Sequence, residues 1–146
     1  MQIKFTKLLH NATKPTRATD GSNGFDLTAA QMRYLGGDII EYDTGIGFEI
    51  PFGYVGLVFP RSSVYTRQLM LANSVGVIDS DYRGPVKLMY VNRKDLSVSH
   101  AHDSEYAVGE RIGQIVFVPT PEIQLVESET LSSTDRGTGG FGSTGQ

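Results

Sequence analysis

The sequence predicts an all-β fold, a jelly roll or distorted β-barrel that contains one short helix. Short apolar runs with β-branched and aromatic residues recur along the chain, and glycine- and proline-rich turns separate them. No stretch of ten residues or more has a helical period of apolar side chains. The 17 glycines among 146 residues also suit turn-rich β structure, and a chain of this length can bury a core as one domain.

Seven runs have the character of strands, and an eighth at Ile123–Val126 is weaker. The seven are Ile3–Leu9, Asp38–Tyr42, Gly45–Ile50, Tyr54–Phe59, Leu69–Ala72, Val86–Asn92 and Arg111–Pro119. The patterns of Lys87–Val91 and Gln114–Val118 predict successive side chains on opposite faces of a sheet. The one helix expected is Ser62–Gln68, with Ser62 as its N-cap.

Composition and charge exclude several classes of function. The chain has no cysteine, so neither a disulfide framework nor a thiolate metal site can form. A formal net charge of −3 argues against a broad surface for duplex nucleic acid, although it leaves room for a local cationic pocket. The first 16 residues lack the continuous apolar core of a signal peptide, and no apolar run approaches transmembrane length. We therefore expect a cytoplasmic protein without membrane contact.

The segment Pro60–Ser63, PRSS, opens the expected helix directly after a strand. Backbone N–H groups at a helix N-terminus favour phosphate, and Arg61 with two hydroxyls would add further donors. A serine pair at a helix start is more often only a cap. The motif alone therefore leaves phosphate binding and helix capping open.

The segment Asn73–Gly84, NSVGVIDSDYRG, is more specific. Its apolar pair, Val77 and Ile78, leads into an acidic turn, which predicts a β-hairpin with polar groups at its tip. Asp79 at the mouth of a cleft would accept a proton from water as a general base, or it would only cap the turn. Tyr82 either packs its ring on a sugar or is a half-exposed strand aromatic.

The last eleven residues, RGTGGFGSTGQ, contain too few apolar side chains to fold alone. A disordered terminus is one interpretation. The other is an arm that orders over a bound nucleotide, with Arg136 on a phosphate and Phe141 stacked on a base. The amides of Gly142, Ser143 and Thr144 would then form an anion-binding nest.

Five segments with chemical character follow one another in a fixed order. They are Gly24–Leu27, Pro60–Ser63, Gly76–Gly84, Gly109–Gln114 and Arg136–Gly145. Together they resemble the five motifs of the homotrimeric deoxyuridine triphosphatases, the dUTP pyrophosphatases. The resemblance spans nearly the whole chain, and its third and fifth motifs are much more specific than the second and fourth.

The resemblance implies a jelly-roll subunit in a homotrimer whose three active sites are built from neighbouring chains. The reaction would convert dUTP and water into dUMP and pyrophosphate, with Mg²⁺ held by the substrate phosphates rather than by direct protein ligands. This would supply dUMP for thymidylate synthesis and keep uracil out of DNA. Residues 1–135 would form the β domain, and residues 136–146 a flexible arm that closes over the active site.

The resemblance also assigns roles to single residues. Asp79 would orient and deprotonate a water for attack on the α-phosphorus, and Tyr82 would pack on the deoxyribose. The other assignments are Asn73, Gly76, Val77 and Ile78 for the uracil edge; Arg61, Ser62, Ser63 and Gln114 for phosphates; Phe141 for the uracil ring; Arg136, Gly142, Ser143 and Thr144 for the β- and γ-phosphates; Asp26 near the metal or the subunit interface; and Lys87 for a nucleotide contact that the strand alternation leaves open.

Four positions depart from the residues that are common in the family. Ser63 and Gly113 stand where glycine and alanine are usual, and Asn23 where alanine is common. Lys87 stands where an apolar or small residue is common. None of the four removes a chemical group that the mechanism needs.

Two other functions remain as alternatives. A dCTP deaminase-like enzyme shares the fold and an Arg-Ser-Ser sequence, but it places a catalytic Glu in the next strand, and Val86–Asn92 contains none. A nucleotide-sensing or protein-binding module is expected to have lost Asp79 or Arg136, and both are present. His100 and His102 have no third ligand at metal-site spacing, so we expect no metal there.

Overall fold

Ten strands and one short helix make up the described part of this computed structural model, residues 1–93 and 105–140. The strands are β1 (Lys4–Lys7), β2 (Phe25–Thr28), β3 (Gln31–Gly36), β4 (Ile39–Asp43), β5 (Ile46–Glu49), β6 (Tyr54–Phe59), β7 (Leu69–Leu71), β8 (Gly76–Ile78), β9 (Lys87–Asn92) and β10 (Arg111–Pro119). The helix, η1 (Ser62–Thr66), is a 3₁₀ helix. The prediction of an all-β chain with one short helix is confirmed.

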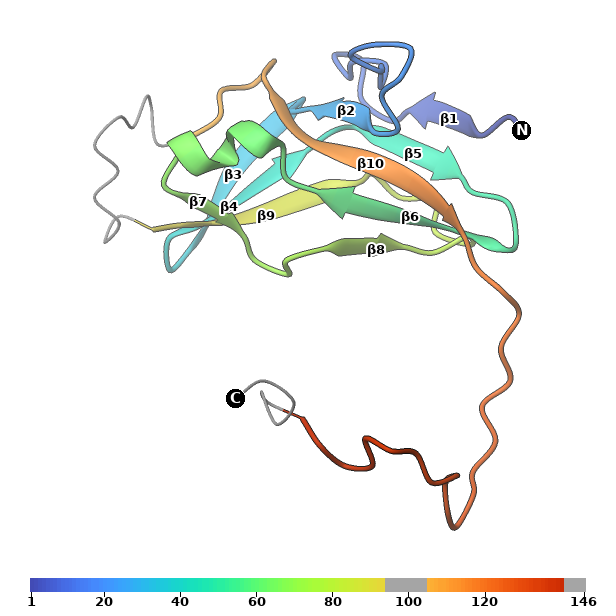
Figure 1. Cartoon of the computed structure of the whole chain (residues 1–146). Coiled ribbons are helices and arrows are strands. Elements are labelled where there is room, and N and C mark those ends of the chain that lie inside the picture. The colour runs from blue at the N-terminus through green and yellow to red at the C-terminus, as the bar shows by residue number, and fades with distance from the viewer. Residues whose placement is uncertain (94–104, 141–146) are drawn as a thin grey trace.

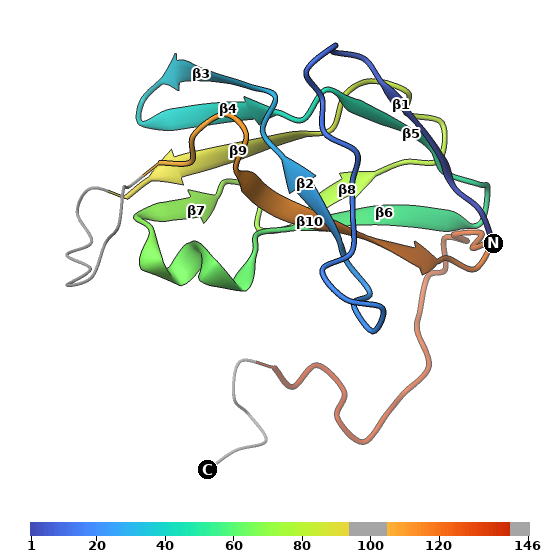
Figure 2. The same cartoon turned by 90° about the horizontal axis from the view of Figure 1, so that it is seen from above.

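Two four-stranded antiparallel sheets pack face to face (Figures 1 and 2). One has the strand order β2-β10-β6-β8 and the other the order β3-β4-β9-β7, while β1 and β5 form a separate pair. Most neighbours within a sheet are not consecutive in the chain, so the chain crosses repeatedly between the layers, as in a jelly roll.

The core lies between the sheets and is marked by the alternation of β9. Leu88, Tyr90 and Asn92 are buried, whereas the residues between them are only half-buried, as the sequence pattern predicts. Tyr42, Tyr90 and Tyr106 pack their rings together with centroids 5.6 to 5.9 Å apart. The Tyr90 hydroxyl donates to the Ile112 carbonyl at 2.6 Å, which ties β9 to β10 across the core.

Most predicted strands are present, with small differences in their ends. Tyr54–Phe59 and Arg111–Pro119 have the predicted bounds, and the other five differ by one or two residues at an end. The sequence does not predict β2, β3 and β8. β2 and β8 have only four and three residues, and β3 has no buried side chain to create a pattern.

The weak strand predicted at Ile123–Val126 is wrong. This segment lies in the exposed chain after β10, where Leu125 is 92% exposed. A strand needs a partner edge for its backbone hydrogen bonds, and this segment pairs with none in the part of the chain that the structure describes.

The predicted helix is shorter than expected and starts differently. It ends at Thr66, and Arg61 takes the N-cap position with an extended backbone and no side-chain cap. The prediction of Ser62 as N-cap is therefore wrong. A 3₁₀ helix of five residues contributes little dipole, so an anion site at this position depends on side chains.

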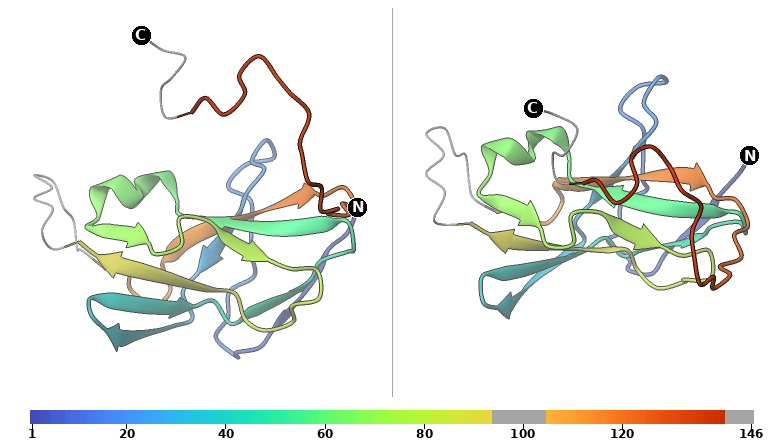
Figure 3. Two further views of the ribbon diagram at one scale, coloured as in Figure 1. Left: turned by 90° about the horizontal axis from the view of Figure 1, so that it is seen from below. Right: turned by 60° about the horizontal axis from the view of Figure 1, so that its bottom comes forward.

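The hairpin predicted for Asn73–Gly84 is also wrong. β8 pairs with β6, and the chain after it crosses to β9 in the other sheet (Figure 3). Val77 is 60% exposed, so only Ile78 of the apolar pair packs against the core. Asp79 and Tyr82 instead close a turn, in which the Tyr82 N–H donates to the Asp79 carbonyl at 3.2 Å.

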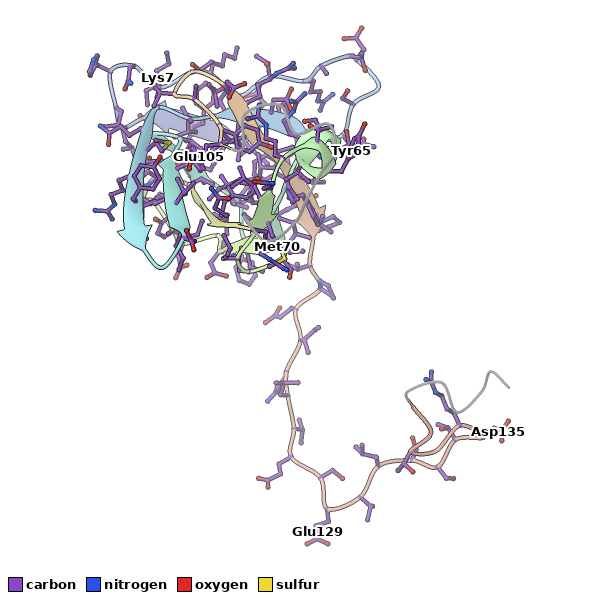
Figure 4. All side chains as sticks on the ribbon, turned by 90° about the vertical axis from the view of Figure 1, so that its left-hand side faces the viewer. Lys7, Tyr65, Met70, Glu105, Glu129 and Asp135 are labelled. Carbon is purple, nitrogen blue, oxygen red and sulfur yellow. The ribbon has the colours of Figure 1, made fainter. Side chains whose placement is uncertain are left out.

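After β10 the chain leaves the body of the molecule. Glu129 and Asp135 lie well away from the sheets in Figure 4. The described part of this tail is almost entirely exposed and contains only local turns. Nowhere in residues 1–93 and 105–140 is there a helix long and apolar enough to cross a membrane.

Candidate active site

Residues from three motifs meet at the end of β6. Asp26 on β2 lies opposite Gln114 on β10, and Gln114 lies opposite Phe59 on β6, so the three positions form a row across the sheet. Arg61 follows two residues after Phe59, and its Nε donates to Asp26 Oδ1 at 3.3 Å. Gln114 Nε2 donates to the Pro60 carbonyl at 3.3 Å.

Hydroxyl and guanidinium donors lie together in this row. Ser63 Oγ is 3.5 Å from Arg61 Nη1, and Ser62 is exposed beside it. Gly24 leaves room for Gln114, because a Cβ on Gly24 would lie 2.4 Å from Gln114 Oε1. A site with these donors suits an anion such as a phosphate group. We call Arg61, Ser62, Ser63 and Gln114 the donor cluster.

Arg111 belongs to this region as well, although sequence reasoning did not single it out. Its Nη1 donates to Asp26 Oδ2 at 2.9 Å, so each oxygen of Asp26 accepts a hydrogen bond from an arginine. The expected role of Asp26 near a metal or a subunit interface stays a prediction. Arg111 and Asp26 come together through the register between β10 and β2. The sequence does not predict β2, so it does not predict this contact.

Asp79 lies at a different place, directly after β8. It lines an open hollow of about 750 Å³ between the turn that follows β8 and the start of the tail. The lining of the hollow also includes Ser80, Asp81 and the aromatic residues Phe52 and Tyr54. Asp79 is exposed there, so water can reach its carboxylate.

Tyr82 folds back over the turn that Asp79 begins. Its hydroxyl donates to the Pro85 carbonyl at 3.1 Å, and the side chain remains 43% exposed. Gly84 makes this possible, since a Cβ there would lie 2.4 Å from the Tyr82 hydroxyl. Tyr82 is therefore held against the turn and remains partly accessible to solvent.

Gly76 and Ile78 lie on β8, and Asn73 precedes that strand by three residues. A Cβ on Gly76 would lie 3.1 Å from Val58 Cβ and 3.7 Å from Asn73 Nδ2, so the backbone of Gly76 packs closely on β6 beside the Asn73 amide. Val77, between Gly76 and Ile78, points to solvent. The assignments of these four residues to a base edge stay predictions.

The donor cluster and Asp79 are far apart within one chain. Gly56 pairs with Ile78, which places Asp79 next to Val55, whereas Arg61 follows the opposite end of β6. Arg61 is six positions after Val55, and at about 3.3 Å per residue the two positions are roughly 20 Å apart. A single phosphate cannot touch both groups of one chain.

Lys87 lies with two acids of the other sheet. Its Nζ is 3.2 Å from Glu41 Oε1 and 3.5 Å from Asp43 Oδ2, both on β4. The hydrogen bond that Lys87 donates to Glu41 is the main cause that raises the pKa of Lys87. A nucleotide contact by Lys87 stays a prediction, and these ion pairs do not support it.

Arg136 is described, but the second half of the fifth motif is not. Arg136 Nε donates to the Gly139 carbonyl at 2.9 Å within the extended tail. Phe141, Gly142, Ser143 and Thr144 lie outside the described residues, as do His100 and His102.

The comparisons with known proteins decide the family. The model of the dUTPase family matches residues 10–145. This chain belongs to the dUTPase family. Its relatives include the deoxyuridine 5'-triphosphate nucleotidohydrolases of Nautilia profundicola, 38% identical with both chains fully covered, and of Yarrowia lipolytica, 38% identical over 99% of this chain and 90% of that one.

Solved dUTPase structures have the same fold. The Staphylococcus bacteriophage 80alpha dUTPase, as a G164S mutant with dUpNHpp, superimposes with a TM-score of 0.84 at 27% identity over 99% of both chains. A D95N mutant of the dUTPase from phage phi11 of S. aureus, which coordinates a structural Mg(II) ion, has a TM-score of 0.75 at 24% identity and covers 91% of this chain. The jelly-roll prediction is thereby confirmed.

Proposed function

We propose that this chain hydrolyses dUTP to dUMP and pyrophosphate. The observation that carries the proposal is the pairing of an exposed acid, Asp79, with a separate cluster of anion donors in a chain of the dUTPase family. Full-length relatives named deoxyuridine 5'-triphosphate nucleotidohydrolases support the substrate. The product dUMP would feed thymidylate synthesis, and removal of dUTP would keep uracil out of DNA.

Asp79 is the proposed general base. It would accept a proton from a water whose oxygen attacks the α-phosphorus, while the bond from that phosphorus to the bridging oxygen breaks and pyrophosphate leaves. The access of solvent to the Asp79 carboxylate supports this role. Tyr82 would pack on the deoxyribose and leave no room for a 2′-hydroxyl.

The active site is proposed to form between chains of a homotrimer. The roughly 20 Å along β6 between the backbones of Asp79 and Arg61 support this, because the acid and the phosphate donors of one chain lie at opposite ends of the strand. Asp79, Tyr82 and the β8 backbone of one chain would then face the donor cluster of its neighbour. A symmetric ring of three chains closes such a heterologous contact.

Mg²⁺ is proposed to enter with the triphosphate. Residues 1–93 and 105–140 hold no group of three or more His, Cys, Asp or Glu that could bind a metal. Mg²⁺ commonly keeps several waters and uses substrate phosphates as ligands. An ion that arrives with the triphosphate therefore needs no cluster of protein carboxylates. The ion would neutralise phosphate charge.

The experiment that tests the function is a nucleotide panel with Mg²⁺ in which pyrophosphate and ammonia are measured separately. We expect selective release of pyrophosphate from dUTP and little from dTTP, dCTP or UTP. Ammonia release from dCTP would instead indicate the deaminase-like alternative.

Asp79→Asn should lower kcat by about 10²- to 10⁴-fold yet still bind dUpNHpp, because only the proton acceptor is removed. Full activity of this variant would overturn the assignment of the base.

The tail is proposed to act as an arm over the nucleotide. Its described part is exposed and reaches away from its own sheets, as an arm that serves another chain would (Figure 4). Removal of residues 136–146 should therefore abolish most turnover while the circular dichroism spectrum and the number of chains in the assembly are unchanged. Loss of assembly would mean that the segment is structural.

A further inference from the structure

Asp26 has two arginine partners, although one would be enough to neutralise it. Arg61 Nε donates to Oδ1 at 3.3 Å and Arg111 Nη1 to Oδ2 at 2.9 Å. The Asp26 side chain is 13% exposed, that of Arg61 28% and that of Arg111 51%. Asp26 is the most buried of the three side chains, and Arg61 is more buried than Arg111. Arg111 therefore lies on the solvent side of Asp26.

The geometry of Arg61 depends on this shared carboxylate. A guanidinium has five N–H donors in a rigid plane, so anchoring Nε fixes the direction of the others. Asp26 alone would also cancel the charge that Arg61 offers to an anion. With Arg111 as a second cation, the three side chains together keep a charge of +1.

Glu110, the residue before Arg111, holds the other end of the same segment. Its Oε1 accepts from Arg67 Nη2 at 3.0 Å, and its Oε2 accepts from the Ala107 N–H at 2.7 Å. Arg67 follows η1 directly, whereas Arg61 precedes it. The start of β10 therefore anchors both ends of the segment that carries Arg61, Ser62 and Ser63.

We propose that Arg111 is a positioning residue for phosphate binding: through Asp26 it orients the Arg61 guanidinium and preserves its net charge. The proposal rests on the proposed function, because it takes Arg61 as a phosphate ligand. Arg111 itself need not touch the substrate.

The test compares Arg111→Gln with Arg33→Gln, a matched control in the other sheet. Arg33 also donates to a buried acid that has a second cation, since Glu41 accepts from Arg33 Nε at 2.7 Å and from Lys87 Nζ at 3.2 Å. We expect Arg111→Gln to weaken dUpNHpp binding about tenfold, with a matching rise in KM for dUTP. Arg33→Gln should leave the Kd for dUpNHpp and KM within about twofold of wild type.

Two further variants separate positioning from simple stability. Arg111→Lys keeps the cation on Asp26 and should recover most of the affinity, whereas a general loss of folded protein would lower the active fraction without changing KM. In a double-mutant cycle, Arg111→Gln should have little further effect once Asp26→Asn is present, because both act through the same guanidinium.

The outcomes distinguish this proposal from the proposed function. If the wild-type chain neither binds dUpNHpp nor hydrolyses dUTP, both fail. If it does both and Arg111→Gln has the wild-type Kd and KM, only the positioning role fails. Equal losses in Arg111→Gln and Arg33→Gln would likewise overturn it.

Discussion

Gly113 lies on β10 where the neighbouring strands leave no room for a Cβ atom. A Cβ at this position would lie 2.4 Å from Leu88 Cδ2 and 2.9 Å from the Phe59 carbonyl oxygen. The second contact is with backbone, which cannot turn away as a side chain can. The glycine that departs from the family's usual alanine is thus matched to a close approach of β10 to β6 and β9 in this chain.

Two buried tyrosines differ in one hydrogen bond and allow a residue-scale prediction. The Tyr90 hydroxyl donates to the Ile112 carbonyl, whereas the Tyr106 hydroxyl has no partner among the described residues. Tyr90→Phe should lower the free energy of unfolding by about 1–2 kcal/mol, because it leaves a buried carbonyl unpaired. Tyr106→Phe should be neutral or stabilising. Urea unfolding at one protein concentration measures both, and equal costs would contradict the assignment.

At the scale of elements, β3, β4 and β9 share one buried acid. Glu41 on β4 is 6% exposed and accepts hydrogen bonds from Arg33 on β3 and Lys87 on β9. Burial acts to raise the pKa of Glu41, but the hydrogen bonds from these two cations outweigh it and hold the pKa below the ordinary 4.5. The charge network thus joins three neighbouring strands on one face of the sheet.

This shift predicts a pH dependence. A carboxyl whose pKa is lowered in the folded state contributes stability above its unfolded pKa and loses it as the pH falls through the folded value. Glu41→Gln should therefore cost about 1–2 kcal/mol at pH 7, and the difference from wild type should shrink below pH 4.5. Urea unfolding from pH 7 to pH 3 measures it. A difference that stays constant over that range would count against an ionised Glu41.

At the scale of the whole molecule, the strand order separates chemistry that the sequence places close together. Arg61 and Asp79 are only 18 residues apart in the chain, yet the pairing of β8 with β6 puts them at opposite ends of one strand. The tail begins beside Asp79, where Thr120 lines the same hollow, and its later part lies exposed away from the sheets (Figure 4). The proposed active site between chains would bring these parts together.

A shared site predicts complementation between inactive chains. Asp79→Asn and Arg61→Gln should each be inactive alone, but mixed trimers contain sites with an intact Asp79 from one chain and an intact Arg61 from its neighbour. Each trimer that contains both variants has one complete site of its three, so the activity of the mixed trimers should recover to about one third of wild type. Co-expression with two affinity tags isolates the mixed trimers. No recovery would place both residues in a site of one chain.

Sequence patterns alone predict the β class and most strands, and they contain the motifs in their order. These follow from local properties: alternation, turn residues and the chemistry of side chains within a few positions of one another. The three-dimensional structure is needed for the pairing of β8 with β6, for Arg61 as the N-cap of the 3₁₀ helix and for the contact of Arg111 with Asp26. Each depends on which strands become neighbours, and that is set by burial of the whole core rather than by any single segment. Asp79 is therefore predicted from its motif, whereas its distance from the donor cluster is known only from the fold.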